Sequence, residues 1–353
     1  MNNGKPLFAL YGELQRQATV SQDYLADTTQ IQMLPSGHIL LDGKDSPFHL
    51  SKNAHKQLAD WANIPHKYYQ RIKQVAPDLL AENVNHWLSN TGKPTRRLIR
   101  TLDGNMRAFL SSKYRRIDNL QIAEAILPIM INNPDIRIES CDITDDRLYI
   151  KCVFPRVEGE VLAGDVVQSG VVVSNSEVGS GALTVSPLVY RLVCTNGMIV
   201  NAANNFGLKQ THVGRQLSAD DDNFEIFSTE TIEADEKALM LKLRDAVSAA
   251  SKQVVFDKIL DKMREAAGST VIKQPIKAVE ELSNTFALRD TEKNSFLTTL
   301  IRDSDYSRWG AINAVTEIAN NLDDYERSTE LETIGGKLLD APKQVWEQIA
   351  DAA

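Results

Sequence analysis

Hydrophobic and polar positions recur with two different periods along the chain, and the change of period divides it into stretches. Residues 1–50 combine short apolar runs with turn signals, which predicts short strands and turns. In residues 51–89 the apolar side chains follow helical spacing, with Ser51 placed to cap a helix and Ala54 and Leu58 on its apolar face. This second stretch is predicted to be a helical block.

Residues 95–200 show mainly the alternation typical of strands. Asp103-Gly104 lies between two alternating runs and is a strong hairpin signal. A helix is expected after Asp118, which can serve as its N-cap, and before Pro134. Four strands are expected at 136–143, 147–154, 166–175 and 183–189, whereas 189–195 fits a helix or a strand. The predicted order from residue 96 to about 200 is β-β-α-β-β-β-α, with room for one more strand before the last helix.

The remaining chain has helical spacing nearly to its end. An acidic run, Asp220-Asp221-Asp222, marks the boundary, and the pattern predicts a long helix over 238–267. Further helices are predicted over 275–286, 291–302, 306–322 and 341–352. The expected fold class is therefore α+β: a core domain over 1–216, with a helical block (51–89) and a core sheet (95–200), followed by an acidic, all-helical region over 217–353.

The composition of the 353 residues is that of an ordinary globular protein, with 42% hydrophobic and 24% charged residues. No apolar run approaches the ~18–20 residues of a membrane helix, and the first eleven residues do not form a signal peptide. The three cysteines, Cys141, Cys152 and Cys194, are too few and too scattered for a disulfide framework. We expect a cytoplasmic protein with no membrane association.

The net charge of −8 is unevenly distributed. Residues 217–353 carry 16 basic and 27 acidic side chains, whereas residues 1–216 carry a net charge of +3. Within 93–116, eight basic side chains accompany a single acid, Asp103. Such clustering is what an anion-binding surface needs, although a solvated charged face shows the same pattern.

Motifs that would indicate an enzyme are missing from the sequence. It has no phosphate-binding glycine loop, no nucleophile elbow and no cysteine or histidine spacing typical of a zinc site. His212 lies in a polar, basic segment, where a surface histidine is a simpler interpretation than a catalytic base. We predict no catalytic residue, no metal site and no cofactor, and expect a protein that is not an enzyme.

The basic stretch is the main candidate for a nucleic-acid contact. Its hairpin can align arginines along a phosphate backbone, and an aromatic ring between basic residues can stack on a base. The predicted phosphate contacts are Lys93, Arg96, Arg97, Arg100, Arg107, Lys113, Arg115 and Arg116, with Tyr114 as the stacking residue. The alternative is that Tyr114 packs in the core and the arginines pair with carboxylates of the acidic region.

Arg191 is a further candidate because it lies inside an apolar segment, where an unpaired guanidinium is costly to bury. A structural ion pair, for example with Glu177, is the favoured interpretation. A phosphate contact is the alternative.

Three segments carry a resemblance to a known family. Arg115-Arg116-Ile117-Asp118-Asn119, Val173-Ser174-Asn175-Ser176-Glu177-Val178-Gly179 and Arg191-Leu192-Val193-Cys194-Thr195-Asn196-Gly197-Met198 resemble the signature blocks of the domain of unknown function 932 family, also called the phage/plasmid-like protein family. The resemblance spans roughly residues 40–215, including the helical block. It implies a context of phages, plasmids and integrative elements, and it supplies no catalytic residues.

The predicted order of elements also invites an analogy with single-strand annealing proteins, which is an analogy of fold alone. On this basis we expect a non-enzymatic protein of a mobile element that binds single-stranded DNA and assists annealing or recombination, as a homo-oligomeric ring or filament. The alternative is a protein-interaction factor that modulates host defence or replication, with the acidic C-terminal region as its working surface or as a nucleic-acid mimic.

Overall fold

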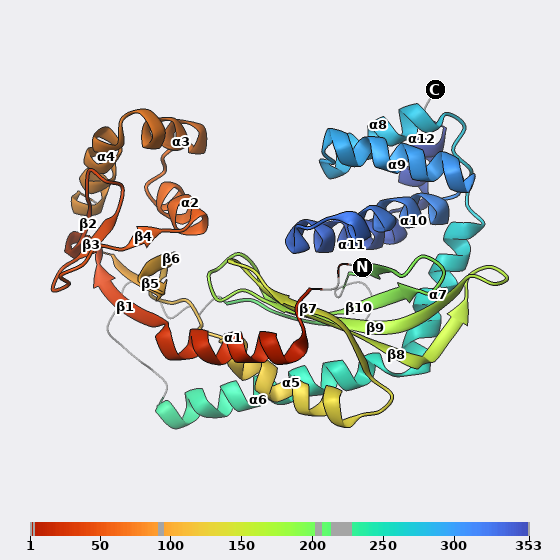
Figure 1. Ribbon diagram of the computed structural model, residues 1–353, viewed down its shortest axis with the longest axis horizontal. Coiled ribbons are helices and arrows are strands. Elements are labelled where there is room, and N and C mark those ends of the chain that lie inside the picture. Colours follow the sequence, from red (N-terminus) through yellow and green to blue (C-terminus); the bar gives the residue numbers. More distant parts are fainter. Residues whose placement is uncertain (1, 3, 91–94, 202–206, 213–227, 352–353) are drawn as a thin grey trace.

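A computed structural model describes residues 2, 4–90, 95–201, 207–212 and 228–351. Lys93 and the acidic run at 220–222 lie outside the described residues, as does the predicted domain boundary at 216. The fold class is α+β, as predicted, with an N-terminal lobe, a central curved sheet and a group of C-terminal helices (Figure 1).

The N-terminal lobe combines a four-stranded sheet with three helices. The sheet has the strand order β1-β5-β6-β4. Its strands are β1 (Gln22–Asp27), β4 (His49–Leu50), β5 (Arg96–Leu102) and β6 (Asn105–Ser111), beside a small pair of β2 (Ile31–Met33) and β3 (Ile39–Leu41). The helices are α2 (Lys52–Trp61), α3 (His66–Val75) and α4 (Pro77–Ser89). As predicted, Ser51 caps α2, where its hydroxyl accepts a hydrogen bond from the Ala54 amide.

The predicted hairpin forms as β5 and β6, but it belongs to this lobe. β5 pairs with β1 and β6, and no strand of the lobe pairs with the central sheet in the described residues. The expectation of one core sheet over 95–200 is therefore not what the structure shows. Alternation identifies a strand and its faces, but it does not specify which strands pair.

The central sheet is antiparallel and has the strand order β11-β10-β9-β8-β7, with β12 paired to β10 beyond the end of β11. Its strands are β7 (Arg137–Ile143), β8 (Leu148–Glu160), β9 (Val166–Asn175), β10 (Leu183–Arg191), β11 (Asn196–Ile199) and β12 (Leu208–Gln210). The segment 189–195, left open between helix and strand, continues β10 and then turns into β11.

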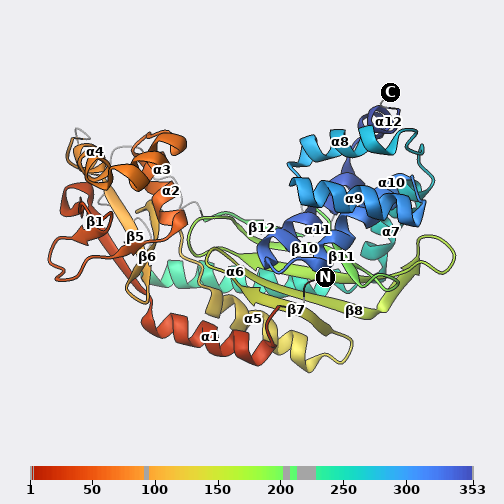
Figure 2. The ribbon, with the colours of Figure 1, turned by 45° about the horizontal axis from the view of Figure 1, so that its top comes forward.

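One face of the central sheet is covered by α1 (Leu7–Val20), α5 (Asn119–Asn132) and α6 (Thr229–Ala250), as Figure 2 shows. Leu10 of α1, Ile126 of α5 and Leu243 of α6 share one buried cluster with Val171 and Val185 of the sheet. α6 is thus part of the core of the molecule. α1 was missed, because residues 1–50 were expected to hold only strands and turns.

The C-terminal helices form a second cluster on the opposite face of the sheet. They are α7 (Gln253–Ala267), α8 (Pro275–Phe286), α9 (Asp290–Asp303), α10 (Arg308–Ile318), α11 (Tyr325–Asp340) and α12 (Lys343–Ala350). The single helix predicted over 238–267 is divided, because α6 ends at Ala250 and α7 begins at Gln253.

α11 was not predicted, and its glycine pair explains both the omission and the packing. Glycine is a poor helix former, so Gly335-Gly336 weakens the helical pattern. A Cβ atom on Gly336 would lie 1.9 Å from the carbonyl oxygen of Ile199. The absence of a side chain therefore allows α11 to lie directly against β11.

Candidate nucleic-acid interface

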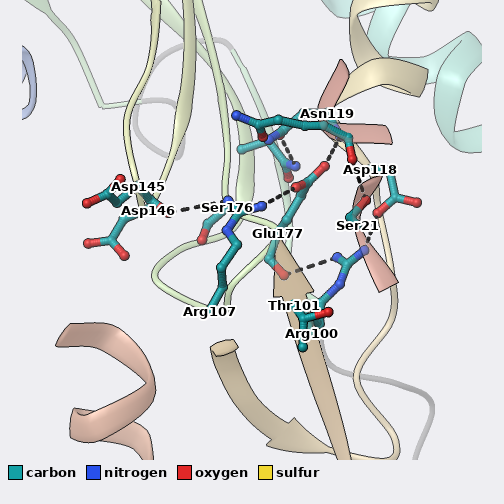
Figure 3. Close-up of polar contacts among 12 residues, drawn as sticks. Ser21, Arg100, Thr101, Arg107, Asp118, Asn119, Asp145, Asp146, Ser176 and Glu177 are labelled. Atoms are coloured by element: carbon teal, nitrogen blue, oxygen red, sulfur yellow. Dashed lines mark hydrogen bonds and ion pairs between the residues drawn. The ribbon is translucent and has the colours of Figure 1, made fainter. Parts of the chain in front are cut away.

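Two of the predicted phosphate contacts, Arg100 and Arg107, lie at the joint, which we define as the contact between the β5–β6 hairpin and the residue 175–181 loop of the central sheet (Figure 3). Arg100 is buried at its centre. Its guanidinium donates hydrogen bonds to Asp23 (2.9 Å), to Asp118 (2.7 Å) and to the backbone carbonyl of Glu177 (3.1 Å). Burial alone would lower the pKa of Arg100, but the Asp118 and Asp23 carboxylates outweigh it and raise that pKa.

Glu177 connects the hairpin to α5. One carboxylate oxygen accepts a hydrogen bond from the backbone amide of Asn119 at 2.7 Å, and the other lies 3.4 Å from Arg107. Asp118 is the N-cap residue of α5, as predicted, but its side chain makes no capping hydrogen bond and instead pairs with Arg100. Glu177 supplies the carboxylate at this helix end in its place. A carboxylate at a helix N-terminus satisfies free amides and interacts favourably with the helix dipole.

Tyr114 is also part of the structure of the joint. Its hydroxyl donates to the backbone carbonyl of Ser176 at 2.9 Å, and its ring stacks on His212 with the centroids 4.9 Å apart. His212 is buried, contrary to the expectation of a surface histidine, and its ring nitrogens contact the Arg115 carbonyl and the Asn175 side chain. Burial lowers the pKa of His212. One face of the Tyr114 ring is therefore occupied within the protein.

Three other arginines of the set have carboxylate partners too. Arg115 lies 3.1 Å from Asp235 of α6, and Arg116 lies 3.4 Å from Asp23. Arg191 pairs with Asp165 at 2.6 Å, so a structural ion pair forms as favoured, but Glu177 was the wrong partner. Each of these contacts neutralises charge that a phosphate would otherwise meet.

Three cations of the stretch have no carboxylate partner in the described residues, and we call them the hairpin end. Arg96 and Lys113 are exposed, at the start of β5 and just after β6. Arg97 lies opposite Ser111 in the sheet, places its guanidinium 4.6 Å from the centre of the Phe109 ring, and donates to the Phe109 carbonyl. Burial lowers the pKa of Arg97 to about 10, which leaves it charged at neutral pH.

A second feature was missed by sequence reasoning. A groove of about 740 Å³ lies between α11 and the face of the central sheet that the α1–α5–α6 layer leaves open. Arg147 and Lys209 line it from the sheet side, and Arg327 and Lys337 line it from α11. These four residues come from three distant parts of the sequence. One wall is α11, the helix that the sequence did not predict because of its glycine pair. Only the strand alternation, which places Ser174, Thr184 and Ser186 on one face, could have indicated a polar surface.

Metal sites and membrane spans are two other kinds of feature that the described residues could carry. Among them, no three histidine, cysteine, aspartate or glutamate side chains gather as they would around a metal ion. None of the helices in this part of the chain is long and apolar enough to cross a membrane.

The fold and the joint define an α+β protein in which a small hairpin lobe is attached by buried ion pairs to a curved antiparallel sheet. The family model "Domain of unknown function (DUF932)" matches residues 108–337. The chain belongs to this family. The match begins after the helical block and extends into α11, whereas the resemblance was expected over roughly 40–215. No curated protein and no solved structure matches the chain.

Proposed function

We propose that this protein binds single-stranded DNA and assists annealing or recombination in a phage- or plasmid-type mobile element, without catalysing a reaction on the strand. The observation that carries the proposal is the hairpin end. Arg96, Arg97 and Lys113 lie near the open end of the β5–β6 hairpin and have no carboxylate partner among the described residues, in a chain whose net charge is −8. Uncompensated cations are the groups that bind phosphates and release counterions.

The hairpin end replaces the longer basic track expected from the sequence. Arg100, Arg107, Arg115, Arg116 and Arg191 are engaged with carboxylates, so binding through them would require those ion pairs to open. Three cations per chain make a small site, and assembly into a ring or filament would place many such sites along one strand. Homo-oligomerisation is therefore part of the proposal.

The test is fluorescence anisotropy with a labelled 30-nucleotide dT strand and the matching duplex, at 50 and 200 mM salt. Three phosphate contacts on a single strand give a slope of about −2 in log K against log salt, or roughly a 20-fold loss of affinity over this range. The variant Arg96→Glu/Lys113→Glu should bind at least tenfold more weakly. The matched control is Lys258→Glu/Lys277→Glu, which reverses two exposed lysines of α7 and α8. Salt-independent binding, or equal losses of affinity in both variants, would refute the hairpin end as the DNA-binding site.

A second candidate function is supported by the ion pairs themselves. Because the chain neutralises most of its own basic stretch, the acidic surface of residues 217–353 remains the larger uncompensated charge. A protein-interaction factor would use this surface to bind a basic partner that normally binds DNA. The same anisotropy experiment separates the two candidates. If the second function is correct, the folded protein should bind neither the single strand nor the duplex.

A further inference from the structure

The groove between the central sheet and α11 has the size and shape of a ligand site. Its volume of about 740 Å³ lies within the range of roughly 300–1,000 Å³ typical of small-molecule and cofactor pockets. The floor comes from β8, β9, β10, β11 and β12, the wall comes from α11, and residues 285–287 at the C-terminal end of α8 also line the groove. The groove is separate from the hairpin end, which lies in the N-terminal lobe (Figure 1).

The floor of the groove carries hydroxyl groups where a packed sheet would carry apolar side chains. Val171, Val173 and Val185 point to the covered face and belong to the core with α5 and α6. The alternate positions of the same strands include Ser174 and Thr184, whose hydroxyl oxygens are 2.8 Å apart. These hydroxyls can donate to, and accept from, a polar ligand.

The charges of the groove are only partly compensated within the protein. Arg147 lies 3.6 Å from Glu326, and Arg327 pairs with Glu330 at 2.7 Å. Lys209 and Lys337 are exposed, and neither forms an ion pair in the described part of the chain. One comes from the sheet and the other from α11, so the groove presents an ammonium group on each side.

The wall of the groove is held in place by a buried ion pair. Lys151 of β8 donates to Glu332 of α11 at 2.6 Å and to Thr329 at 2.9 Å, and both charged side chains are fully buried. A charge buried away from water is stable only while its counter-charge stays beside it. The pair therefore fixes α11 at one distance from the sheet. The groove is therefore preformed, which lowers the entropic cost of binding a ligand.

From these features we infer that the groove binds a phosphate-bearing sugar ligand, with Lys209 and Lys337 contacting phosphate oxygens and the floor hydroxyls contacting the sugar or phosphate. Lysine ammonium groups are common phosphate ligands, and serine and threonine hydroxyls supply much of the remaining contact in nucleic-acid complexes. The same chemistry is offered by a free nucleotide and by one or two nucleotides of a single strand. The second source rests on the proposed function.

The test measures binding of dTMP, the tetranucleotide dT4 and thymidine to the full chain by isothermal titration calorimetry. Wild type should bind dTMP or dT4, and thymidine at least tenfold more weakly, because it lacks the phosphate. Lys209→Ala/Lys337→Ala should weaken dTMP or dT4 binding at least tenfold, and Lys209→Arg/Lys337→Arg should restore it. Lys258→Ala/Lys277→Ala is the matched control and should stay within twofold. Equal affinities for dTMP and dT4 identify a free nucleotide, and tenfold tighter binding of dT4 identifies a strand.

Two outcomes would overturn the inference that the groove binds this ligand. One is that wild type binds neither dTMP nor dT4, and the other is that the affinities are unchanged in Lys209→Ala/Lys337→Ala. Urea unfolding midpoints equal to that of wild type establish that both exposed lysines can be replaced without loss of the fold. The hairpin-end variant keeps the two proposals apart. If Arg96→Glu/Lys113→Glu loses the 30-nucleotide strand while the groove variant binds every probe normally, the groove is refuted and the proposed function stands. The opposite pattern supports the groove and refutes the hairpin end.

Discussion

The buried pair of Lys151 and Glu332 allows a quantitative prediction. At 2.6 Å, their Coulomb attraction is about 6 kcal/mol with an effective dielectric constant near 20. Removing each charge from water costs several kcal/mol, so the net contribution of the intact pair is close to zero. The two single changes and the double change are therefore expected to have very different effects.

The single variant Glu332→Leu leaves the Lys151 ammonium buried beside Thr329 with no counter-charge. We expect it to lower the free energy of unfolding by about 3–5 kcal/mol. The double variant Lys151→Met/Glu332→Leu removes both charges and keeps most of the volume, so it should lie within about 1 kcal/mol of wild type or exceed it. The coupling between the two positions should then be at least about 2 kcal/mol.

The assay is urea unfolding of wild type, Lys151→Met, Glu332→Leu and the double variant, followed by far-UV circular dichroism. The dependence of the unfolding free energy on urea concentration checks that the same transition is compared in all four. A double variant as unstable as Glu332→Leu would refute the reasoning, because the loss would then come from packing. A single variant within 1 kcal/mol of wild type would equally refute it, because the lysine would have found another way to be solvated.

Two further predictions concern single carboxylate and imidazole groups. Glu177→Gln should reduce the free energy of unfolding by about 1–2 kcal/mol, because it removes the charged cap of α5 and the ion pair with Arg107. The control Glu124→Gln, on the exposed side of α5, should change the free energy of unfolding by less than about 0.5 kcal/mol. Equal effects of the two variants would mean that the cap contributes nothing. Burial lowers the pKa of His55 to about 4, so this side chain takes up a proton at a higher pH in the unfolded chain than in the folded protein. About 3 kcal/mol of stability that is present above pH 6.5 should therefore be lost as the pH falls toward 4. His55→Gln should flatten this part of the profile of stability against pH, and an unchanged profile would exclude His55 as its source.

The elements that the sequence predicted best are those with a strong local signal. The β5–β6 hairpin follows from Asp103-Gly104 and the alternation on either side, and α2 begins where Ser51 predicts it. The α+β class follows from the change of period. α11 was not predicted because Gly335-Gly336 serves close packing against β11, a tertiary reason that a local propensity cannot show.

The site was harder to predict because its chemistry depends on partners remote in sequence. A basic run shows how many charges are present, but it does not show that Arg100 meets Asp23 and Asp118 or that Arg115 meets Asp235. Sequence spacing therefore overestimated the positive surface. The groove depends on the approach of β12 and α11, which no spacing within either element specifies.

The joint also bears on the order of folding. Glu177 is 70 residues from Arg107 and 58 from Asn119, so these contacts close long loops. The chain must lose the entropy of loop closure before the contacts can stabilise the fold. The N-terminal lobe has its own buried cluster, with Ile39, Leu58 and Phe109 among its members, and the central sheet has another. The lobe cluster can form from contacts within residues 26–109, whereas the cluster of the central sheet also recruits Leu10 and Leu14 of α1, which precede the lobe in the chain. Docking of the lobe onto the sheet is therefore expected to be the late and slow event in folding, and the joint the first contact to open when the protein unfolds.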